Sequence, residues 1–447
     1  MGMGVKTDKL RSVVLAILVL LSFLFSYYLW TAGRGMGEEE MTSGTTSQSN
    51  VSITTHTESD TFRPTIVALH GTDNQDQIQI GRTYPLRNLL SDMFETQDLN
   101  QIDRSIITNY EEYINEMEQG RWLEFVYSEA HPLGLIDQKF EEISRDMSQN
   151  FYDRVSINID NPTSVYFYHT ESQTMHVAST SGGEDLAIEP FLSEENIDYT
   201  GAYPVFLNNN IVYLPTDPVN IPNRRYVIEQ LPNGVYINNF FPDTSLMDRR
   251  SNSNITRFID LTKEVSINQN IYTLNYLRQI SDTGDLEPTT RFERSFNQVN
   301  RFENWSDTFV VSNYDETEEI IEFQREIDGY PVFSLNGYET ISEVGLVETG
   351  VTHLKLPLRF INTPIDIQGA PEKELMSGEE LWTRLEEGTP GNVYNRIEDL
   401  SIGYSWDQSE EDNQVVNFNP DWFVLVDGDW MIWEDYLELD KEATNGL

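Results

Sequence analysis

The stretch Val13–Trp30, VVLAILVLLSFLFSYYLW, decides how this chain of 447 residues is organised. It contains no charged residue, and with Ser12, Thr31 and Ala32 the uncharged run reaches 21 residues. At 1.5 Å per residue, a helix of this length covers about 31 Å, which is enough to cross the hydrocarbon core of a bilayer. The sequence therefore predicts a transmembrane helix over residues 12–32.

The charges on either side of this run give it a direction. Lys9 and Arg11 precede it, whereas three glutamates follow at residues 38–40. Because positively charged flanks stay in the cytoplasm, residues 1–11 are predicted to form a cytoplasmic tail and the rest of the chain an extracytoplasmic part. Aromatic side chains at the outer end are typical of a membrane interface. The predicted interface anchors of this single-pass protein of the cell membrane are Lys9, Arg11, Tyr27, Tyr28 and Trp30.

A cleaved signal peptide is the alternative interpretation of the same stretch. Signal peptides have a shorter apolar core and a cleavage site between small residues. Here the run is long and ends in the bulky residues 27–30. The sequence therefore favours an anchor that stays attached to the chain.

The predicted helix also carries two pairs of small residues four positions apart. Such pairs lie on one helix face, let two helices approach closely and can hydrogen-bond to a partner. The cytoplasmic tail of 11 residues is too short to fold, so the span is the direct route to a cytoplasmic activity. We therefore predict contacts with a transmembrane partner at Ser12, Ala16, Ser22 and Ser26.

Composition excludes several classes of function. The chain has 29 Lys and Arg against 74 Asp and Glu, a net charge of −45, which repels the phosphates of nucleic acids. A surface this acidic is typical of a saline or alkaline exterior, with an acidic patch for a basic partner as the alternative. The lack of cysteine removes disulfides, zinc–thiolate sites and thiol catalysis. Hydrophobic residues at 38% and aromatic residues at 12% are sufficient for folded cores.

Beyond the span, the sequence predicts a linker and three folded domains. Residues 33–60 are rich in Gly, Ser and Thr and show no hydrophobic period, which is typical of a flexible linker. A first mixed domain is predicted over 61–188, a second α/β domain over 189–310 and a third over 311–440. The fold class predicted for the whole chain is thus mixed α+β, with a membrane helix in front of it.

Hydrophobic spacing indicates the elements of the first domain. Apolar residues at helical spacing predict helices over 86–94 and 136–147. Residues 122–127 (WLEFVY) are predicted to form a strand, and residues 165–177 are predicted to form a hairpin.

A partial repeat suggests that the second and third domains are related. Residues 203–206 (YPVF) recur at 330–333, and each copy is followed by a strand that ends in Leu-Pro. Each copy then leads to a predicted helix, at 225–231 and at 379–385. In the last third, apolar residues alternate through 422–432, which predicts strands whose tryptophans pack in the core.

The sequence predicts no cofactor, metal or catalytic site. The six histidines have no recognised ligand spacing, and no phosphate-binding, nucleophile-elbow or HExxH motif occurs. Acidic residues are so frequent that carboxylate pairs arise by chance. A glycan hydrolase that uses two carboxylates is nevertheless kept as an alternative function, and a small-molecule sensor with an exterior pocket as a third.

Several segments together resemble a known family. They are the basic tail and span closing on Trp30-Thr31, NFFPD at 239–243, DGYPVF at 328–333, SGEEL at 377–381, LSIGY at 400–404 and NPDWF at 419–423. In this order they resemble the YycH family of single-span extracytoplasmic proteins. The resemblance implies a three-domain exterior whose later two domains share a mixed α/β fold with YycI. It also implies non-enzymatic regulation of the WalK (YycG) sensor histidine kinase, a role in cell-wall homeostasis, and a YycI-like single-span partner.

Overall fold

The computed structural model describes residues 56–71, 78–183, 185–186, 188, 199–207, 210–241, 243, 247–252, 254–280, 284–334, 338–365, 371–388, 396–409 and 412–445. These residues belong to one compact unit, 52–447. The predicted tail, the predicted span and the predicted linker up to residue 55 lie outside them. The last residues of that linker, 58–60, are helical in α2 (Glu58–Thr61). Within the described ranges, no helix combines the length and the apolar character needed to cross a membrane.

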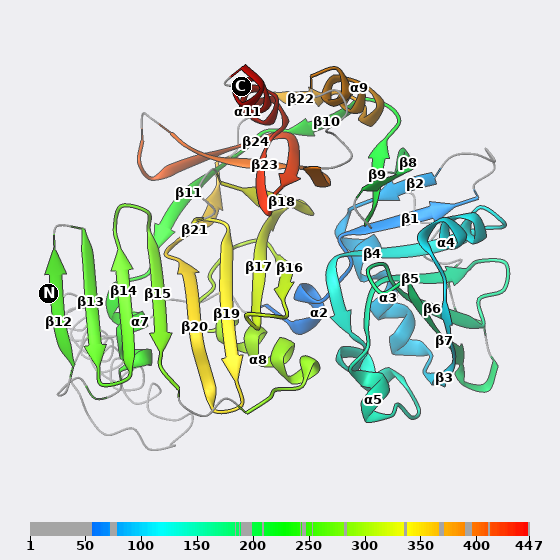
Figure 1. The fold of residues 1–447 in the computed structure, drawn as a ribbon, viewed down its shortest axis with the longest axis horizontal. Coiled ribbons are helices and arrows are strands. Elements are labelled where there is room, and N and C mark those ends of the chain that lie inside the picture. Colours follow the sequence, from blue (N-terminus) through cyan, green and yellow to red (C-terminus); the bar gives the residue numbers. More distant parts are fainter. Residues whose placement is uncertain are drawn as a thin grey trace, which may run out of the picture. The chain divides into compact units, whose positions relative to one another are not determined.

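Nine antiparallel strands form the first sheet, in the order β3-β7-β6-β5-β4-β1-β2-β8-β9 (Figure 1). They are β1 (Ile66–His70), β2 (Ile78–Gly81), β3 (Leu99–Ile107), β4 (Trp122–Pro132), β5 (Phe151–Asn158), β6 (Ser164–His169), β7 (Thr174–Thr180), β8 (Thr200–Leu207) and β9 (Asn210–Pro215). The predicted strand at 122–127 is confirmed as part of β4, and the predicted hairpin as β6 and β7.

Both faces of the first sheet are buried because β4 alternates large apolar residues on its two sides. Leu123 and Phe125 belong to a core cluster that includes the apolar face of α3 (Tyr84–Thr96). Trp122 and Val126 belong to a second cluster, which includes α4 (Tyr110–Met117). The helix predicted at 86–94 is therefore confirmed, and the sheet lies between two helices.

The helix predicted over 136–147 is wrong. This stretch contains most of the 3-10 turn η1 (Leu133–Lys139) and much of the short helix α5 (Arg145–Ser148). Between them, Phe140 has an extended backbone and forms a β-bridge with Leu99, which buries its ring. The apolar residues thus meet the core from two short turns. Two further short elements are α2 (Glu58–Thr61) and the 3-10 turn η2 (Ser181–Gly183).

A second sheet of fourteen strands contains the rest of the core. Its main path is β12-β13-β14-β15-β20-β19-β17-β18-β23-β24-β11-β21, with β16 on β17 and β25 on β24. The bounds are β11 (Arg224–Gln230), β12 (Asp248–Asn252), β13 (Ile255–Asp260), β14 (Lys263–Asn268), β15 (Thr273–Arg278), β16 (Phe309–Asp315), β17 (Ile320–Ile327), β18 (Tyr330–Phe333), β19 (Ile341–Val347), β20 (Gly350–Pro357), β21 (Arg359–Pro364), β23 (Ile397–Gln408), β24 (Val415–Val426) and β25 (Asp429–Ile432). A separate pair consists of β10 (Val219–Pro222) and β22 (Glu372–Leu375).

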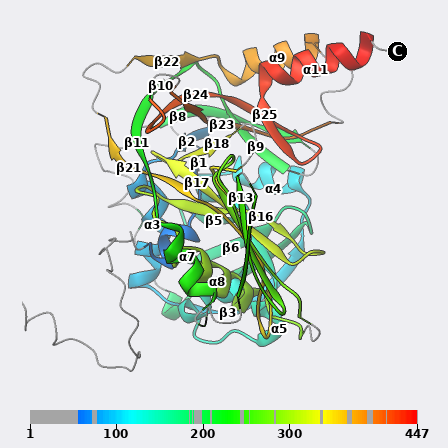
Figure 2. The same cartoon turned by 90° about the vertical axis from the view of Figure 1, so that its left-hand side faces the viewer.

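Eight of these strands form a repeat that the strand order makes visible. A helix followed by four antiparallel strands occurs as α7 (Asn233–Phe240) with β12–β15, and again as α8 (Pro288–Asn300) with β16, β17, β19 and β20. The last strands of the two units, β15 and β20, pair antiparallel. Figure 2 shows α7 and α8 on the same side of these strands, where their apolar residues enter one core cluster. The opposite face of the eight strands is more exposed.

The helix predicted at 225–231 is wrong, because most of this segment is strand β11. It pairs with β24 on one side and β21 on the other, so its backbone groups are satisfied by distant segments. The helix predicted at 379–385 is confirmed within α9 (Gly378–Gly388). The alternating C-terminal residues form β24 and β25 as predicted, before the last helix, α11 (Trp433–Asn445).

The two YPVF segments lie in different sheets. The first is in β8 and pairs with β9 in the nine-stranded sheet, whereas the second is β18, which pairs with β17 and β23. The division into domains at 188/189 and 310/311 stays a prediction, and β8 and β9 extend the first sheet across the first of these boundaries. The fold class is mixed, as predicted, and the structure shows that strands predominate.

Candidate functional site

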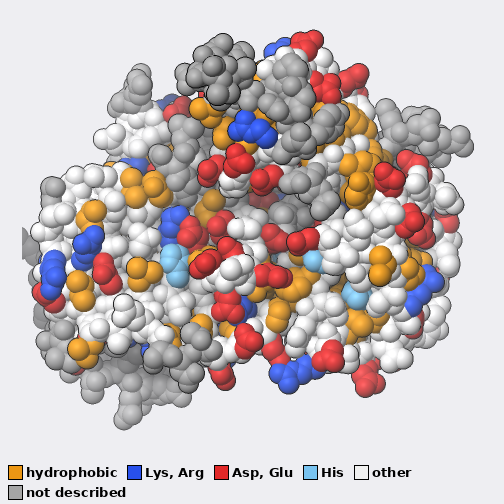
Figure 3. Space-filling model, viewed as in Figure 1, with side chains coloured by type: hydrophobic (Ala, Val, Ile, Leu, Met, Phe, Trp, Pro, Cys, Tyr) orange, Lys and Arg blue, Asp and Glu red, His pale blue; other side chains and the backbone are white. Residues whose placement is uncertain are grey.

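A cleft opens where the end of β4 in the first sheet approaches the end of β16 in the second. Its volume is about 280 Å³. Four of its eight lining residues carry carboxylates, so the cleft is acidic. Figure 3 shows Asp and Glu side chains gathered on this part of the surface, around β16 and β17. The lining residues are Glu129, Ala130, Phe151, His169, Glu171, Tyr314, Asp315 and Glu316.

A break in the pairing of β4 positions Glu129 at the cleft. The register between β4 and β5 shifts between Val126 and His131, so the segment between them leaves β5 and approaches β16. Ser128 Oγ donates a hydrogen bond to the Val311 carbonyl at 2.6 Å. The Glu129 carboxylate accepts from the backbone N–H of Tyr314 at 3.3 Å. This carboxylate therefore links the two sheets.

Burial raises the pKa of Glu129 to about 7. Hydrogen bonds from the backbone N–H of Ala130 and of Tyr314 oppose the shift, and the charges of Asp153 and Glu171 add to it. A carboxylic acid with this pKa changes its charge near neutral pH, unlike an exposed glutamate. We therefore expect the contact between β4 and β16 to depend on pH.

Glu129→Gln is expected to change how stability depends on pH. Because the folded pKa lies above the usual value of about 4.5, Glu129 favours folding when protonated, and this contribution is lost as the pH rises from about 4.5 through 7. The variant keeps a neutral group at all pH values. Its free energy of unfolding should exceed that of the unmodified chain by on the order of 1–3 kcal/mol at pH 8, with a smaller difference at pH 5.5.

Urea unfolding of the full chain in detergent, followed by tryptophan fluorescence between these pH values, measures the difference. Glu118→Gln is the control, since this exposed glutamate directly follows α4 and is not among the charges that shift the pKa of Glu129. It should leave the pH slope nearly unchanged. Equal slopes for Glu129→Gln and the unmodified chain would contradict the assignment.

The donor set of the cleft does not match a metal centre. Within the described ranges, no group of three or more His, Asp or Glu side chains is arranged to hold a metal ion. His169 hydrogen-bonds to Ser172 Oγ at 2.9 Å, and His176 to Ser105 Oγ at 2.7 Å. His169 and His176 thus have separate hydroxyl partners.

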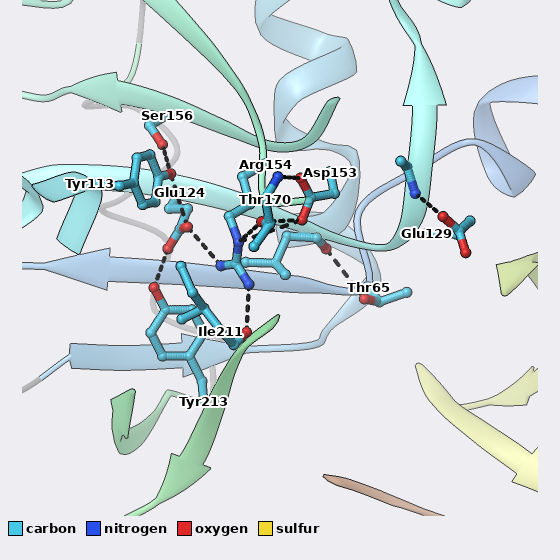
Figure 4. Close-up of polar contacts among 12 residues, drawn as sticks. Thr65, Tyr113, Glu124, Glu129, Asp153, Arg154, Ser156, Thr170, Ile211 and Tyr213 are labelled. Carbon is cyan, nitrogen blue, oxygen red and sulfur yellow. Dashed lines mark hydrogen bonds and ion pairs between the residues drawn. The ribbon is translucent and has the colours of Figure 1, made fainter. Parts of the chain in front are cut away.

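A second polar cluster is fully buried in the first sheet (Figure 4). At its centre is Glu124 of β4, which faces α4 and is not exposed to solvent. Arg154 Nη1 lies 2.9 Å from Glu124 Oε1, which also accepts from the Tyr113 hydroxyl at 3.0 Å. Tyr213 donates to Oε2 at 2.5 Å, and His70 Nε2 lies 2.9 Å from the same oxygen. Both carboxylate oxygens are therefore occupied by protein groups.

The electrostatics of this cluster keep Glu124 ionised. Burial alone would raise the pKa of Glu124, but the charge of Arg154 and hydrogen bonds from His70 and Tyr213 outweigh it and hold that pKa well below its usual range. Burial raises the pKa of Tyr113 and Tyr213 well above the ordinary value, so both hydroxyls remain proton donors. A carboxylate in this state is a structural anion, since it has neither a proton to give nor a free oxygen for a substrate.

A buried ion pair joins α3, which packs on the first sheet, to β17 of the second sheet. This contact is called the junction below. Both oxygens of Glu326 in β17 accept from Arg87 Nη2 of α3, at 3.0 and 2.8 Å, and each side chain is 1% exposed. Thr308 Oγ1 donates to the same carboxylate at 3.0 Å and accepts from Arg63 Nη2 at 2.8 Å. Gly329, just after the end of β17, has a positive φ of 79°. A Cβ at this position would lie 2.6 Å from the Arg82 carbonyl oxygen. The junction is therefore closely packed.

The sequence-predicted site residues, Lys9, Arg11, Ser12, Ala16, Ser22, Ser26, Tyr27, Tyr28 and Trp30, lie outside the described residues. Sequence reasoning missed the groups at the junction and in the first sheet. A charged residue inside an apolar strand, as in WLEFVY, is a signal that could have indicated Glu124. No comparable signal marks Arg87 or Glu326, because each is one charged residue among many.

The fold and its junction place the chain among mixed α/β proteins built mainly from strands. Two family models match it: "YycH protein, N-terminal domain" over residues 8–187 and "YycH protein, C-terminal domain" over residues 209–440. Together they cover most of the sequence, so the chain belongs to the YycH family. The resemblance inferred from sequence segments is thereby confirmed.

One relative and one solved structure extend the comparison. The chain is 19% identical over 462 residues to the "Two-component system WalR/WalK regulatory protein YycH" of Bacillus subtilis (strain 168), covering 98% of this chain and 99% of the relative. The crystal structure of YycH from Bacillus subtilis superposes with a TM-score of 0.67 at 15% identity, covering 85% of this chain and 98% of that one. The two chains therefore share a fold.

Proposed function

We propose that this chain is a membrane-anchored, non-enzymatic regulator of a sensor histidine kinase of the WalK (YycG) type, in a two-component system for cell-wall homeostasis. One observation carries the proposal: the similarity to a named WalR/WalK regulatory protein runs through nearly the full length of both chains. Under this proposal the activity lies in contacts with other proteins.

The proposed location is the cell membrane, with the N-terminus in the cytoplasm and most of the chain outside. The apolar run at 12–32 and its flanking charges support this location. On a helix, Ser22 and Ser26 share one face, as do Ser12 and Ala16, and these are the proposed contacts with the kinase's transmembrane helices. The exterior domains would bind a YycI-like single-span protein and the kinase's sensor domain. The regulator can affect the kinase only if it binds one conformational state of the kinase better than the other.

Neither the family models nor the named relative supports the other candidate functions. A glycan hydrolase needs an accessible acid and a second carboxylate at a defined distance, whereas Glu124 is enclosed by its partners. The cleft at Glu129 is smaller and far more acidic than a typical small-molecule pocket, which is mostly apolar and about 300–1,000 Å³ in volume.

A membrane pull-down tests the proposed function. The full-length tagged chain should co-purify a sensor kinase and a second single-span protein, and mass analysis of the same sample should find residues 1–32 intact. Ser22→Leu with Ser26→Leu should reduce kinase recovery about tenfold or more, because larger side chains keep the helices apart. Leu20→Ala with Leu24→Ala, on the opposite helix face, is the matched control and should retain it. A chain cleaved near residue 33 and recovered alone would contradict the proposal.

A further inference from the structure

The outer edge of the second sheet is basic in an otherwise acidic chain. Residues 248–278, which form β12–β15, include five basic and three acidic side chains, against 29 and 74 in the whole chain. Three of the five, Arg249, Arg250 and Arg257, belong to the two outermost strands, β12 and β13. Figure 3 shows Lys and Arg side chains over these strands and Asp and Glu side chains toward β16 and β17. The sheet thus has a positive edge.

β12 is open to solvent along its whole length. All five residues, Asp248–Asn252, are exposed, and in the described part of the chain β12 pairs with β13 alone. An edge strand presents a row of unpaired backbone N–H and C=O groups, which is a template for a strand from another chain. Peptides that add to a sheet in this way gain affinity from backbone hydrogen bonds and specificity from side chains.

Two arginines on this edge lie where their like charges destabilise the strand pair. Arg250 lies directly opposite Arg257 in the antiparallel register, and like charges in this position destabilise a strand pair. Their acidic contacts, Asp248 and Glu264, lie in the same or the next strand, and the arginines remain 70% and 55% exposed. A charge of either sign would protect the edge against aggregation, and this chain has far more acidic than basic residues. The positive charge therefore points to recognition of an anionic group.

We propose that β12 binds an extended acidic segment of a partner protein, which adds to the second sheet as a further strand. Carboxylates on one face of that segment would pair with Arg250 and Arg257. A second copy of this chain fits less well, because antiparallel pairing of two β12 strands about Arg250 would place two arginines opposite each other. The net charge of the chain does not prevent binding, since at about 0.15 M salt charges beyond about 8 Å are screened.

The inference rests on the proposed function only in taking the chain to act by binding. Binding to β12 is tested with a short, fluorescently labelled peptide of alternating glutamate and valine. The peptide is titrated against the full chain in detergent. We expect binding that weakens with salt and that protects residues 248–252 from hydrogen exchange. Arg250→Glu should weaken it by about tenfold or more, because the variant places a negative charge against the peptide.

Arg384→Glu is the matched control, because Arg384 is also an exposed arginine in an ion pair, with Glu380 on α9. It should leave the affinity unchanged. A peptide with lysine in place of glutamate should not bind. Failure of the glutamate peptide to bind, equal binding to Arg250→Glu, or equal binding of the lysine peptide would each overturn the inference. None of these results affects kinase recovery in the pull-down, so the two proposals fail separately.

Discussion

Arg154→Met is expected to lower the free energy of unfolding by about 3–5 kcal/mol, because it leaves the buried carboxylate of Glu124 without its cation. Arg154 is also a hydrogen-bond donor to the Ile211 carbonyl at 2.5 Å, so the substitution removes a link between β5 and β9. Neither Arg154 nor Glu124 has more than 1% of its side chain exposed, and solvent cannot replace the lost contacts. Urea unfolding of the full chain in detergent, followed by tryptophan fluorescence, measures the loss.

Two further variants separate charge from packing in this cluster. Tyr213→Phe removes one hydrogen bond to Glu124 and keeps the ion pair, so about 1.5–3 kcal/mol should be lost. Arg154→Met combined with Glu124→Leu removes both charges. It should recover only part of the stability, because no buried charge remains but the donors of His70, Tyr113 and Tyr213 lose their acceptor. A loss under 1 kcal/mol for Arg154→Met alone would show that the buried ion pair is misassigned.

Arg87→Met is expected to have an effect of similar size, about 3–5 kcal/mol, at the junction of the two sheets. The variant leaves the Glu326 carboxylate buried, with Thr308 at hydrogen-bond distance and Arg63 3.9 Å away. Since Arg87 belongs to α3 and Glu326 to β17, the first sheet should also unfold at a lower urea concentration than the second. Hydrogen exchange resolved by segment, together with urea unfolding, measures both effects.

The chain offers a matched control for this prediction. Arg145 of α5 also forms an ion pair, with Glu287 just before α8, but its side chain is 78% exposed. Exposed ion pairs contribute about 0–1 kcal/mol, so Arg145→Met should have little effect on stability. If both variants lost the same small amount, the junction would not depend on burial of Glu326.

Hydrophobic periodicity correctly predicted elements whose apolar pattern arises within one strand or one helix. The alternation in residues 122–127 follows from a strand that is buried on both faces, and the helical spacing at 86–94 follows from a helix with one apolar face. The segment at 136–147 has the same spacing but is divided between two short turns, because Phe140 pairs with Leu99. A pattern of apolar residues thus indicates burial more reliably than it indicates the backbone conformation.

The segment at 225–231 illustrates a different limit. Its residues were compatible with a helix, yet β11 forms because β21 and β24 supply hydrogen-bond partners from more than 100 residues away. The recurring YPVF letters likewise lie in different sheets, whereas the strand order shows a repeat of one helix and four strands that occurs twice. Pairing of distant strands has no local signature in one sequence.

The sequence by itself determined the family, the mixed fold class, the acidic character and the expectation of one membrane span, because each depends on composition or on residues close together in the chain. Only the tertiary structure decided the acidic cleft at Glu129, the buried pair Arg87–Glu326 and the basic edge at β12. The two partners of that pair are 239 residues apart. Burial, hydrogen-bond partners and the resulting pKa shifts arise only when such distant segments pack together, so one sequence contains no local pattern that reveals them.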